Sequence, residues 1–234
     1  MFIVQKKYKV HQGLSLMFTP AIHRRKSMSI QINYHSSIRI EDKAVMYFDP
    51  WKIEGEPHDA DIIFVTHTHY DHFSPEDILK IRRSDTVIVA PETAGQEILD
   101  GVSMDADFLV TAEPGEKIEV DGILIEAVPA YNIGKPFHKK EYGWCGYVVT
   151  GTKSYYVAGD TDVTPELMKL NADVFLLPVG GKYTMDAKEA ADLVNKIGVK
   201  KAIPTHYGEV AGGPDCGRKF AELLNADTEV EVML

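Results

Sequence analysis

The sequence predicts a layered α/β fold, and two features of the chain support this prediction. Short, apolar, β-branched runs alternate with segments that carry helix start and stop signals, as in residues 62–65 before 75–83 and residues 173–179 before 187–197. Strands that alternate with helices usually pack as sheets covered by helices. In addition, several of these strands end in polar residues suited to chemistry, which is where sites form in α/β folds.

The composition is that of an ordinary globular protein with an acidic surface. The chain has 234 residues, of which 44% are hydrophobic and 26% charged, and its formal net charge is −10. This length suffices for one large domain, and the acidity argues against nucleic-acid binding, which needs clustered Lys and Arg. The absence of an apolar run of about 18 residues argues against a membrane span. We therefore expect a cytoplasmic protein with a small-molecule substrate, in which Cys145 and Cys216 are free thiols.

Residues 1–27 are expected to form an N-terminal extension to a single domain over residues 28–234. Alternation at residues 8–10 and an apolar run at 14–18 predict one or two edge strands packed on the domain. The basic patch at residues 23–26 is expected to be a solvated loop.

The domain opens with three consecutive predicted strands, over residues 29–34, 37–40 and 44–51. His35 stands in the turn between the first two strands. Asp49 comes near the end of the third strand and directly before a proline, where an aspartate commonly serves as a turn residue.

The next predicted strand, residues 62–65, leads into a cluster of side chains that bind metals. Neutral imidazole nitrogens and carboxylate oxygens are ligands of Zn²⁺. Side chains two residues apart in an extended segment point to the same side, so two of these histidines could chelate one ion. The cluster consists of His67, His69, Asp71 and His72.

The middle of the chain contains further helices and then becomes all β. Ser74 and Pro75 have the properties of a helix cap and first helical residue. We expect helices over residues 75–83 and 92–100, the latter closed by Gly101, strands over 86–90, 107–110, 117–120, 123–128 and 146–149, and a tight hairpin turn at Asp121-Gly122.

Two later strands also end in ligand-type residues. The predicted strand 154–158 runs into Asp160, and the strand 202–205 runs into His206. Alone each signal is weak, because Gly-Asp is a common turn and a single histidine at a strand end usually has a structural role. Together with residues 67–72 they place chemistry at three strand ends. The remaining predicted elements are a helix start at Thr164-Pro165, a strand over 173–179, a helix over 187–197 closed by Gly198, a helix over 216–225 and a final strand over 228–233.

The pattern H-x-H-x-D-H at residues 67–72 resembles the signature of the metallo-β-lactamase superfamily. The chain looks most like the small bacterial metal-dependent hydrolases of that superfamily that are distantly related to ascorbate-6-phosphate lactonase. His35-Ser36-Ser37 and Asp49-Pro50-Trp51 are similar to the first two strand-end turns of that group. The resemblance runs from about Met28 to the C-terminus and implies a four-layer αββα sandwich with metals at one edge of the two sheets.

The resemblance also implies roles for individual residues. Two divalent ions are expected, Zn²⁺ first, with Mn²⁺ or Fe²⁺ as alternatives, because mixed nitrogen and oxygen ligands select weakly among them. Asp71 and Asp160 would be catalytic, the latter by bridging both ions, and Asp49 would hold a ligand histidine from behind. The implied metal ligands are His67, His69, Asp71, His72, Asp160 and His206.

The loop after the strand 123–128 departs from that pattern. The superfamily's third histidine for the first metal is expected where Asn132 stands, and His138 follows later in the loop. Asn132 could bind weakly through its carbonyl, His138 could reach in from the loop, or the first site could lack a ligand. The candidates for further substrate or metal contacts are His35, Tyr131, Asn132, His138, Lys182 and Tyr183.

The leading functional hypothesis is a hydrolase that uses a metal-activated water on a small, anionic ester, lactone or phosphodiester. One alternative is a nuclease of the same superfamily, against which the net acidity counts. The other is a non-catalytic metal-binding scaffold or sensor. Catalytic zinc sites keep an open coordination position and structural sites are closed, so a water or anion bound at the metal would separate the two.

Overall fold

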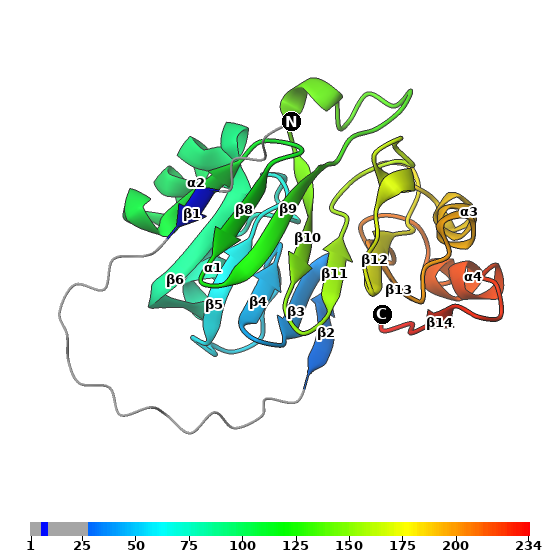
Figure 1. Ribbon diagram of the computed structural model, residues 1–234, viewed down its shortest axis with the longest axis horizontal. Helices are drawn as coiled ribbons and strands as arrows, with labels where there is room; N and C mark the ends of the chain where they lie inside the picture. The colour runs from blue at the N-terminus through cyan, green and yellow to red at the C-terminus, as the bar shows by residue number, and fades with distance from the viewer. Residues whose placement is uncertain (1–5, 9–27) are drawn as a thin grey trace.

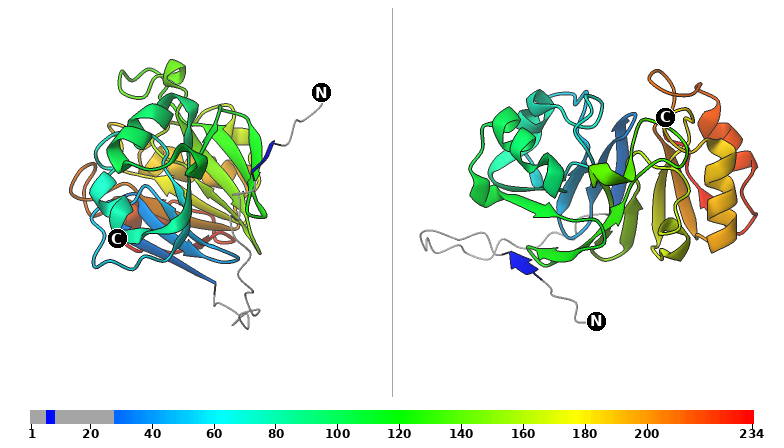
Figure 2. Two further views of the ribbon diagram at one scale, coloured as in Figure 1. Left: turned by 90° about the vertical axis from the view of Figure 1, so that its left-hand side faces the viewer. Right: turned by 90° about the horizontal axis from the view of Figure 1, so that it is seen from above.

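The computed structural model describes residues 6–8 and 28–234. Within them, two β-sheets pack face to face, and helices lie on the outer face of each sheet (Figures 1 and 2). The predicted αββα sandwich is therefore confirmed.

The first sheet has six strands whose spatial order follows the chain. Strands β2 to β4 are antiparallel, and β4 to β7 run parallel. Helices α1 (Pro75–Ile81) and α2 (Gly95–Val102) connect parallel strands. The strands are β2 (Ser29–Tyr34), β3 (Ser37–Glu41), β4 (Val45–Phe48), β5 (Ala60–Phe64), β6 (Arg82–Pro91) and β7 (Leu109–Ala112).

In the described part of the chain, the second sheet has eight strands and carries α3 (Ala187–Ile197) and α4 (Cys216–Glu222) on its outer face. It begins with β1 (Lys6–Tyr8), which pairs in parallel with β8 at the sheet edge. The apolar run 14–18 and the basic patch 23–26 lie outside the described residues. The other strands are β8 (Lys117–Val120), β9 (Ile123–Pro129), β10 (Cys145–Thr150), β11 (Ser154–Val157), β12 (Val174–Pro178), β13 (Lys201–Thr205) and β14 (Glu229–Val230).

Strand β5 shows how the sequence pattern produces the layers. Successive side chains of a strand point to opposite faces. Ile62 and Phe64 therefore enter the core between the sheets, whereas Ile63 and Val65 pack under the helices with residues such as Ile78 of α1. Because both faces of the sheet are covered here, residues 62–65 are all apolar, as is typical of parallel strands.

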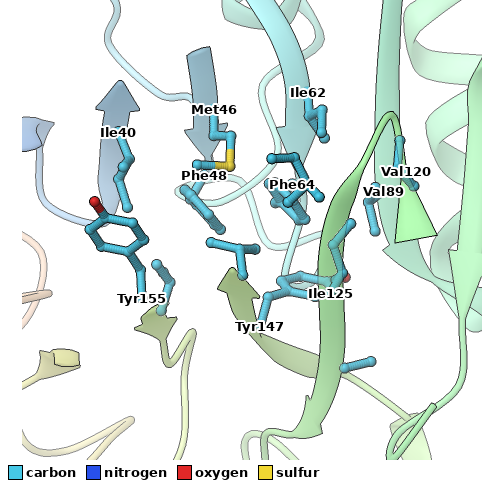
Figure 3. Close-up of a cluster of buried hydrophobic side chains, with 14 of the residues drawn as sticks. Ile40, Met46, Phe48, Ile62, Phe64, Val89, Val120, Ile125, Tyr147 and Tyr155 are labelled. Atoms are coloured by element: carbon cyan, nitrogen blue, oxygen red, sulfur yellow. The ribbon is translucent and has the colours of Figure 1, made fainter. Parts of the chain in front are cut away.

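Aromatic rings from both sheets pack among the aliphatic side chains of the core between the sheets (Figure 3). Phe48 stacks on Phe64 with ring centroids 4.5 Å apart, and Tyr147 of the second sheet packs against Phe64 at 5.2 Å. The buried Tyr147 hydroxyl donates a hydrogen bond to Val65 O at 2.9 Å. This bond crosses between the sheets just before the predicted metal-binding loop and so fixes that loop against β10.

Helix α3 begins and ends where the sequence predicts. Asp186 and Glu189 form a capping box at its start, and Gly198 closes it with a φ of 72°.

Helix α2 does not end at Gly101 as expected but continues to Val102, and Ser103 closes it with a φ of 50°. A Cβ at position 101 would lie 3.0 Å from Phe73 Cζ and 3.2 Å from Pro75 Cγ. Gly101 therefore lets α2 pack closely against Phe73 and the start of α1 and does not act as a cap.

Three other predicted helices are shorter than expected. Thr164-Pro165 leads only to a 3₁₀ turn, α1 ends at Ile81 because residue 82 already pairs in β6, and α4 ends at Glu222. The 3₁₀ helices are η1 (Glu92–Ala94), η2 (Ala106–Phe108), η3 (Lys140–Tyr142) and η4 (Leu167–Lys169).

Cys145 and Cys216 are both free thiols, and burial raises the pKa of Cys145 to about 12. In the described ranges, no helix has the length and apolarity needed to cross a bilayer.

Candidate metal centre

Strand ends from both sheets meet at one edge of the sandwich. In the first sheet, the relevant residues follow β2, β4 and β5, and in the second they follow β11 and β13. The three loops singled out in the sequence thus come together, joined by two positions that precede them in the chain. The residues at these ends are His35, Asp49, the segment 67–72, Asp160 and His206.

The backbone is in the left-handed region at three of these strand ends. The φ angles of His35, Asp49 and His206 are 51°, 45° and 54°. Residues other than glycine rarely adopt such φ angles unless the surrounding structure enforces them. Residues with such angles cluster at functional sites. The amide of His206 donates to His35 O at 3.1 Å, which ties an end of the second sheet to a turn of the first.

A first group of donor atoms is formed by three histidines and one carboxylate. His67 Nε2 lies 3.1 Å from His69 Nδ1, which lies 3.3 Å from His138 Nε2. His138 Nε2 is also 3.3 Å from Asp160 Oδ2. Ligands around a tetrahedral Zn²⁺ with bonds near 2.0 Å are roughly 3.3 Å apart. The spacing of these atoms therefore fits a shared ion.

A second group lies on the other side of the same carboxylate and contains His35, Asp71, His72 and His206. Asp71 Oδ2 lies 3.7 Å from the Nε2 atom of each of these three histidines. Asp160 Oδ1 is 3.2 Å from His72 Nε2 and 3.0 Å from His206 Nε2. One oxygen of Asp160 thus faces each group.

Several buried atoms of this centre have no hydrogen-bond partner among the described residues. They include the Nε2 atoms of His35, His72 and His206 and the Oδ1 atom of Asp160. An unsatisfied buried polar group costs about 1–3 kcal/mol. The described residues contain three sets of three His or Asp side chains, and within each set the ligand atoms lie within 4.8 Å of one another. The residues present therefore fit a divalent metal with nitrogen and oxygen ligands.

The environment favours the ligand form at His67 and Asp160. Burial lowers the pKa of His67 well below its usual value, which keeps the ring neutral. Burial alone would raise the pKa of Asp160, but the rings of His206 and His72 hold the pKa of that carboxyl well below its usual range. Metals bind neutral imidazole and ionised carboxylate, so both effects favour metal binding at neutral pH. At His72 and His206 burial alone would lower the pKa, but the Asp160 carboxylate raises it, so a metal ion would replace a proton at these two rings.

Asp49 supports the centre from behind, in the position that the resemblance implies. Its Oδ2 accepts from His72 Nδ1 and from Thr66 Oγ1, both at 2.7 Å, and its Oδ1 accepts from Thr66 N at 2.7 Å. With the hydrogen on Nδ1, His72 keeps a lone pair on Nε2, toward the centre. Gly159 approaches this support closely, with a φ of 63°, and a Cβ there would lie 2.9 Å from Thr66 Cβ.

Asn132 lies behind His138 rather than beside the other ligands. Its Oδ1 accepts from His138 N at 3.1 Å and from His138 Nδ1 at 3.0 Å, and its Nδ2 donates to Tyr183 O at 2.8 Å. Both ends of the carboxamide are thus engaged with the protein. This geometry favours the alternative in which His138 reaches in from the loop.

A cavity of about 420 Å³ opens over the centre. It makes part of both donor groups accessible to a small molecule. The lining consists of ligand-type residues His69, Asp71, His138, Asp160 and His206, and of the uncharged residues Tyr70, Pro136, Phe137, Tyr183 and Val210.

The remaining candidate contacts are divided by the structure. Tyr183 lines the cavity, whereas Tyr131 and Lys182 do not. The hydroxyl of Tyr131 donates to Glu166 Oε2 at 2.9 Å, and Lys182 Nζ lies 4.5 Å from the ring centroid of Tyr183. His35 belongs to the second donor group.

Sequence reasoning missed Trp144 and most of the cavity wall. The Trp144 ring lies 4.7, 5.0 and 5.6 Å from the rings of His67, His69 and His138. Phe137 could have been noticed as the neighbour of His138. Nothing local pointed to Trp144, because its contacts arise only when the start of β10 lies beside the loop after β5.

Comparisons with known proteins identify the family of this chain. Residues 32–207 match the Beta-lactamase superfamily domain. The UPF0173 metal-dependent hydrolase of Nanoarchaeum equitans is 32% identical over 224 residues, covering 88% of this chain and all of that protein. The corresponding protein of Thermococcus onnurineus is 31% identical over 225 residues, covering 85% and 93% of the two chains.

Structural comparison points to the same family. A crystal structure from Parabacteroides distasonis, provisionally named a metal-dependent hydrolase, shares 28% identity, covers 88% of this chain and 92% of its own, and has a TM-score of 0.72. The link to ascorbate-6-phosphate lactonase stays a prediction. The chain belongs to the β-lactamase superfamily and, within it, to the UPF0173 metal-dependent hydrolases.

Proposed function

We propose that this protein hydrolyses a small ester, lactone or phosphodiester with two bound divalent ions, Zn²⁺ in the first instance and Mn²⁺ or Fe²⁺ as alternatives. The main support is the position of Asp160: it lines an accessible cavity, and its two oxygens face two separate groups of histidines. Family membership supports the reaction class, and the geometry supports the number of ions.

Each donor group would hold one ion, and Asp160 would bridge them. Ions bound there would lower the pKa of a water molecule toward neutrality and polarise a carbonyl or phosphoryl oxygen of the substrate. The proposed ligands of the first ion are His67, His69, His138 and Asp160, and those of the second are His35, Asp71, His72, His206 and Asp160.

The protein's own groups orient these ligands and handle the proton. Asp49 and Thr66 fix the tautomer and position of His72, and Trp144 covers the rings of the first group. Asp71 lines the cavity, so we assign its carboxylate the catalytic role of accepting the proton that an attacking water loses. Asp160, whose two oxygens face the two donor groups, has the catalytic role of helping to hold both ions.

The two alternatives receive less support from the geometry. A closed structural metal site would not need the cavity that opens over both donor groups. A nuclease would need cations along a phosphate path, but the formal charge is −10 and the described residues that line the cavity include no Lys or Arg. A cytoplasmic location remains part of this proposal.

Elemental analysis and a turnover screen test the function together. Protein purified without chelator should contain two transition-metal ions per chain. The metal-loaded protein should turn over at least one member of a panel of lactones, phosphodiesters and thioesters. Asp160→Asn keeps the size of the bridge but loses its charge, and should lower metal content and reduce the rate on the order of 10²-fold.

Two outcomes would contradict the proposal. One is the absence of transition metal from protein never exposed to chelator. The other is an Asp160→Asn protein that binds both ions and turns over substrate at the parent rate. An Asp227→Asn variant, changed at an exposed aspartate, serves as the matched control.

A further inference from the structure

We infer that the substrate presents an uncharged aromatic or other apolar group to the cavity wall, so the preferred class is a neutral ester or lactone. This inference rests on the proposed function and names the substrate class of the same site. It differs from the anionic substrate expected from the sequence.

Among the described residues, those that line the cavity beyond the metal ligands are all uncharged. These wall residues are Tyr70, Pro136, Phe137, Tyr183 and Val210. Tyr70 is 68% exposed and Phe137 is 37% exposed, although both are large and mostly apolar side chains. Exposed apolar surface that is gathered at one place marks a binding site more often than chance exposure does.

Neighbouring rings hold the aromatic side chains of the wall in place. Phe137 meets Tyr183 edge to face, with ring centroids 4.7 Å apart and planes at 76°. Tyr70 meets Trp51 at 5.7 Å and 82°. Edge-to-face pairs of this kind are stabilising. The wall is therefore organised before a ligand arrives, which reduces the entropy cost of binding a ring or alkyl chain.

The lysines near this region are directed to other partners. Lys182 Nζ lies over the ring of Tyr183, and Lys135 Nζ donates to Thr184 O at 2.7 Å while pairing with Asp162. Neither residue lines the cavity.

An anionic group that a substrate placed against this wall would therefore lose its bound water without gaining a cation as a partner. Such a group is costly to desolvate unless it is paired. Lys52, on the segment after β4, already pairs with Glu209 at 3.7 Å, and the carboxylate of Glu209 would repel an anionic group of the substrate. The wall selects against carboxylate and phosphate tails and accepts apolar ones.

The reaction on this substrate class is an ordinary hydrolysis. The water oxygen bonds to the carbonyl carbon, and the bond from that carbon to the alcohol oxygen breaks. One water proton goes to the departing alkoxide, and the acid product releases the other to solvent.

Binding of small hydroxamic acids to the metal-loaded full chain tests the inference without relying on turnover. Acetohydroxamic and benzohydroxamic acid share a metal-binding head and differ in a methyl or phenyl group. Calorimetry should show benzohydroxamic acid binding roughly 10-fold or more tightly, because only the phenyl ring reaches the wall. Succinic acid monohydroxamate, which adds a carboxylate, should bind no better than acetohydroxamic acid.

Variants of the wall locate the effect. Phe137→Ala and Tyr70→Ala should each remove most of the phenyl advantage and leave acetohydroxamic acid binding unchanged. Both side chains are exposed at the surface, so the fold should tolerate their loss. Leu124→Ala, at a 45% exposed apolar residue of β9 outside the cavity, is the matched control and should change neither affinity.

The outcomes separate this inference from the proposed function. If the carboxylate probe binds as tightly as benzohydroxamic acid, or if the wall variants keep the full phenyl advantage, the inference is wrong although the hydrolase proposal stands. If protein of verified metal content binds no hydroxamic acid and turns over no ester, lactone or phosphodiester, both are wrong. Parallel rates on phenyl acetate and its para-carboxylate analogue, the former expected to be higher, provide the kinetic check.

Discussion

His138 supplies an imidazole to the first donor group, and Asn132 holds that imidazole in position. The His138 ring reaches the first donor group from a loop, and its Nδ1 faces two acceptors, Asn132 Oδ1 at 3.0 Å and Tyr183 O at 3.2 Å. The hydrogen must therefore sit on Nδ1, and the lone pair of Nε2 points toward His69 and Asp160. We regard Asn132 as a positioning residue that acts through His138.

Substitutions at these two positions should affect metal affinity to different extents. His138→Ala should remove a ligand of the first ion, and Asn132→Ala should weaken the same ion by about 10–100-fold, because loss of an orienting partner has this effect at metal sites. Asn132→His should not tighten the ion. Competition with a chromogenic chelator measures all three, with His58→Ala at an exposed histidine as the control.

The opposite pattern would place the ligand elsewhere. If Asn132→His tightened one ion while His138→Ala left both affinities unchanged, Asn132 would occupy the ligand position and His138 would be an ordinary cavity residue.

At the scale of elements, Asp42 joins a hairpin of each sheet at the end away from the metal centre. It follows β3, and its Oδ2 accepts from Thr152 N at 2.8 Å, from Lys153 N at 3.2 Å and from the Tyr155 hydroxyl at 3.1 Å. The chain runs from His35 at the centre to Asp42 at the opposite edge. This carboxylate therefore holds the β10–β11 turn against the first sheet.

Asp42→Ala should reduce the free energy of unfolding by about 1–3 kcal/mol at neutral pH, because three donors lose their acceptor. Burial alone would raise the pKa of Asp42, but the bonds from Thr152, Lys153 and Tyr155 lower it below its usual value. A carboxyl with a depressed folded-state pKa stabilises the protein above its unfolded-state pKa of about 3.9, and this contribution is lost as the pH falls through the folded value.

Urea denaturation at pH 6 and near pH 3 measures this effect. The difference between parent and Asp42→Ala should shrink at the lower pH, whereas an Asp227→Ala control should show little difference at either pH. An equal loss of stability at both pH values would show that packing, and not the ionised carboxylate, makes the contribution.

At the scale of the whole molecule, each sheet supplies part of the metal centre. Asp71 and His72 come from the first sheet, and Asp160 and His206 come from the second. Ions bound between these residues would link the two sheets, in addition to the contacts of the apolar core. Because the ligands converge only in the folded chain, metal affinity adds to folding stability.

Removal of metal should therefore lower the thermal midpoint. Free metal at 100 times its dissociation constant stabilises a protein by about 2.7 kcal/mol per site. Melting curves with excess Zn²⁺ and after exhaustive chelation should differ clearly for the parent and for His58→Ala, and much less for Asp160→Asn. A parent Tm unaffected by chelation, with metal removal verified by elemental analysis, would contradict the coupling.

The sequence by itself determined the alternation of strands and helices, the exact span of α3, and the strand end at which His67, His69, Asp71 and His72 gather. These features depend on local rules of periodicity, capping and turn preference, which act within a few residues. The superfamily signature lies in one such local stretch, so the family was predictable as well.

Only the tertiary structure decided how the centre is completed. Whether Asn132 or His138 faces the ligands depends on the path of a long loop, and the contacts of Trp144 depend on which strands are neighbours. Gly101 likewise continues a helix that its sequence signal would end, because it packs against Phe73. Side-chain direction in loops and the composition of a cavity wall arise from packing between segments far apart in the chain, and local sequence patterns carry no record of that packing.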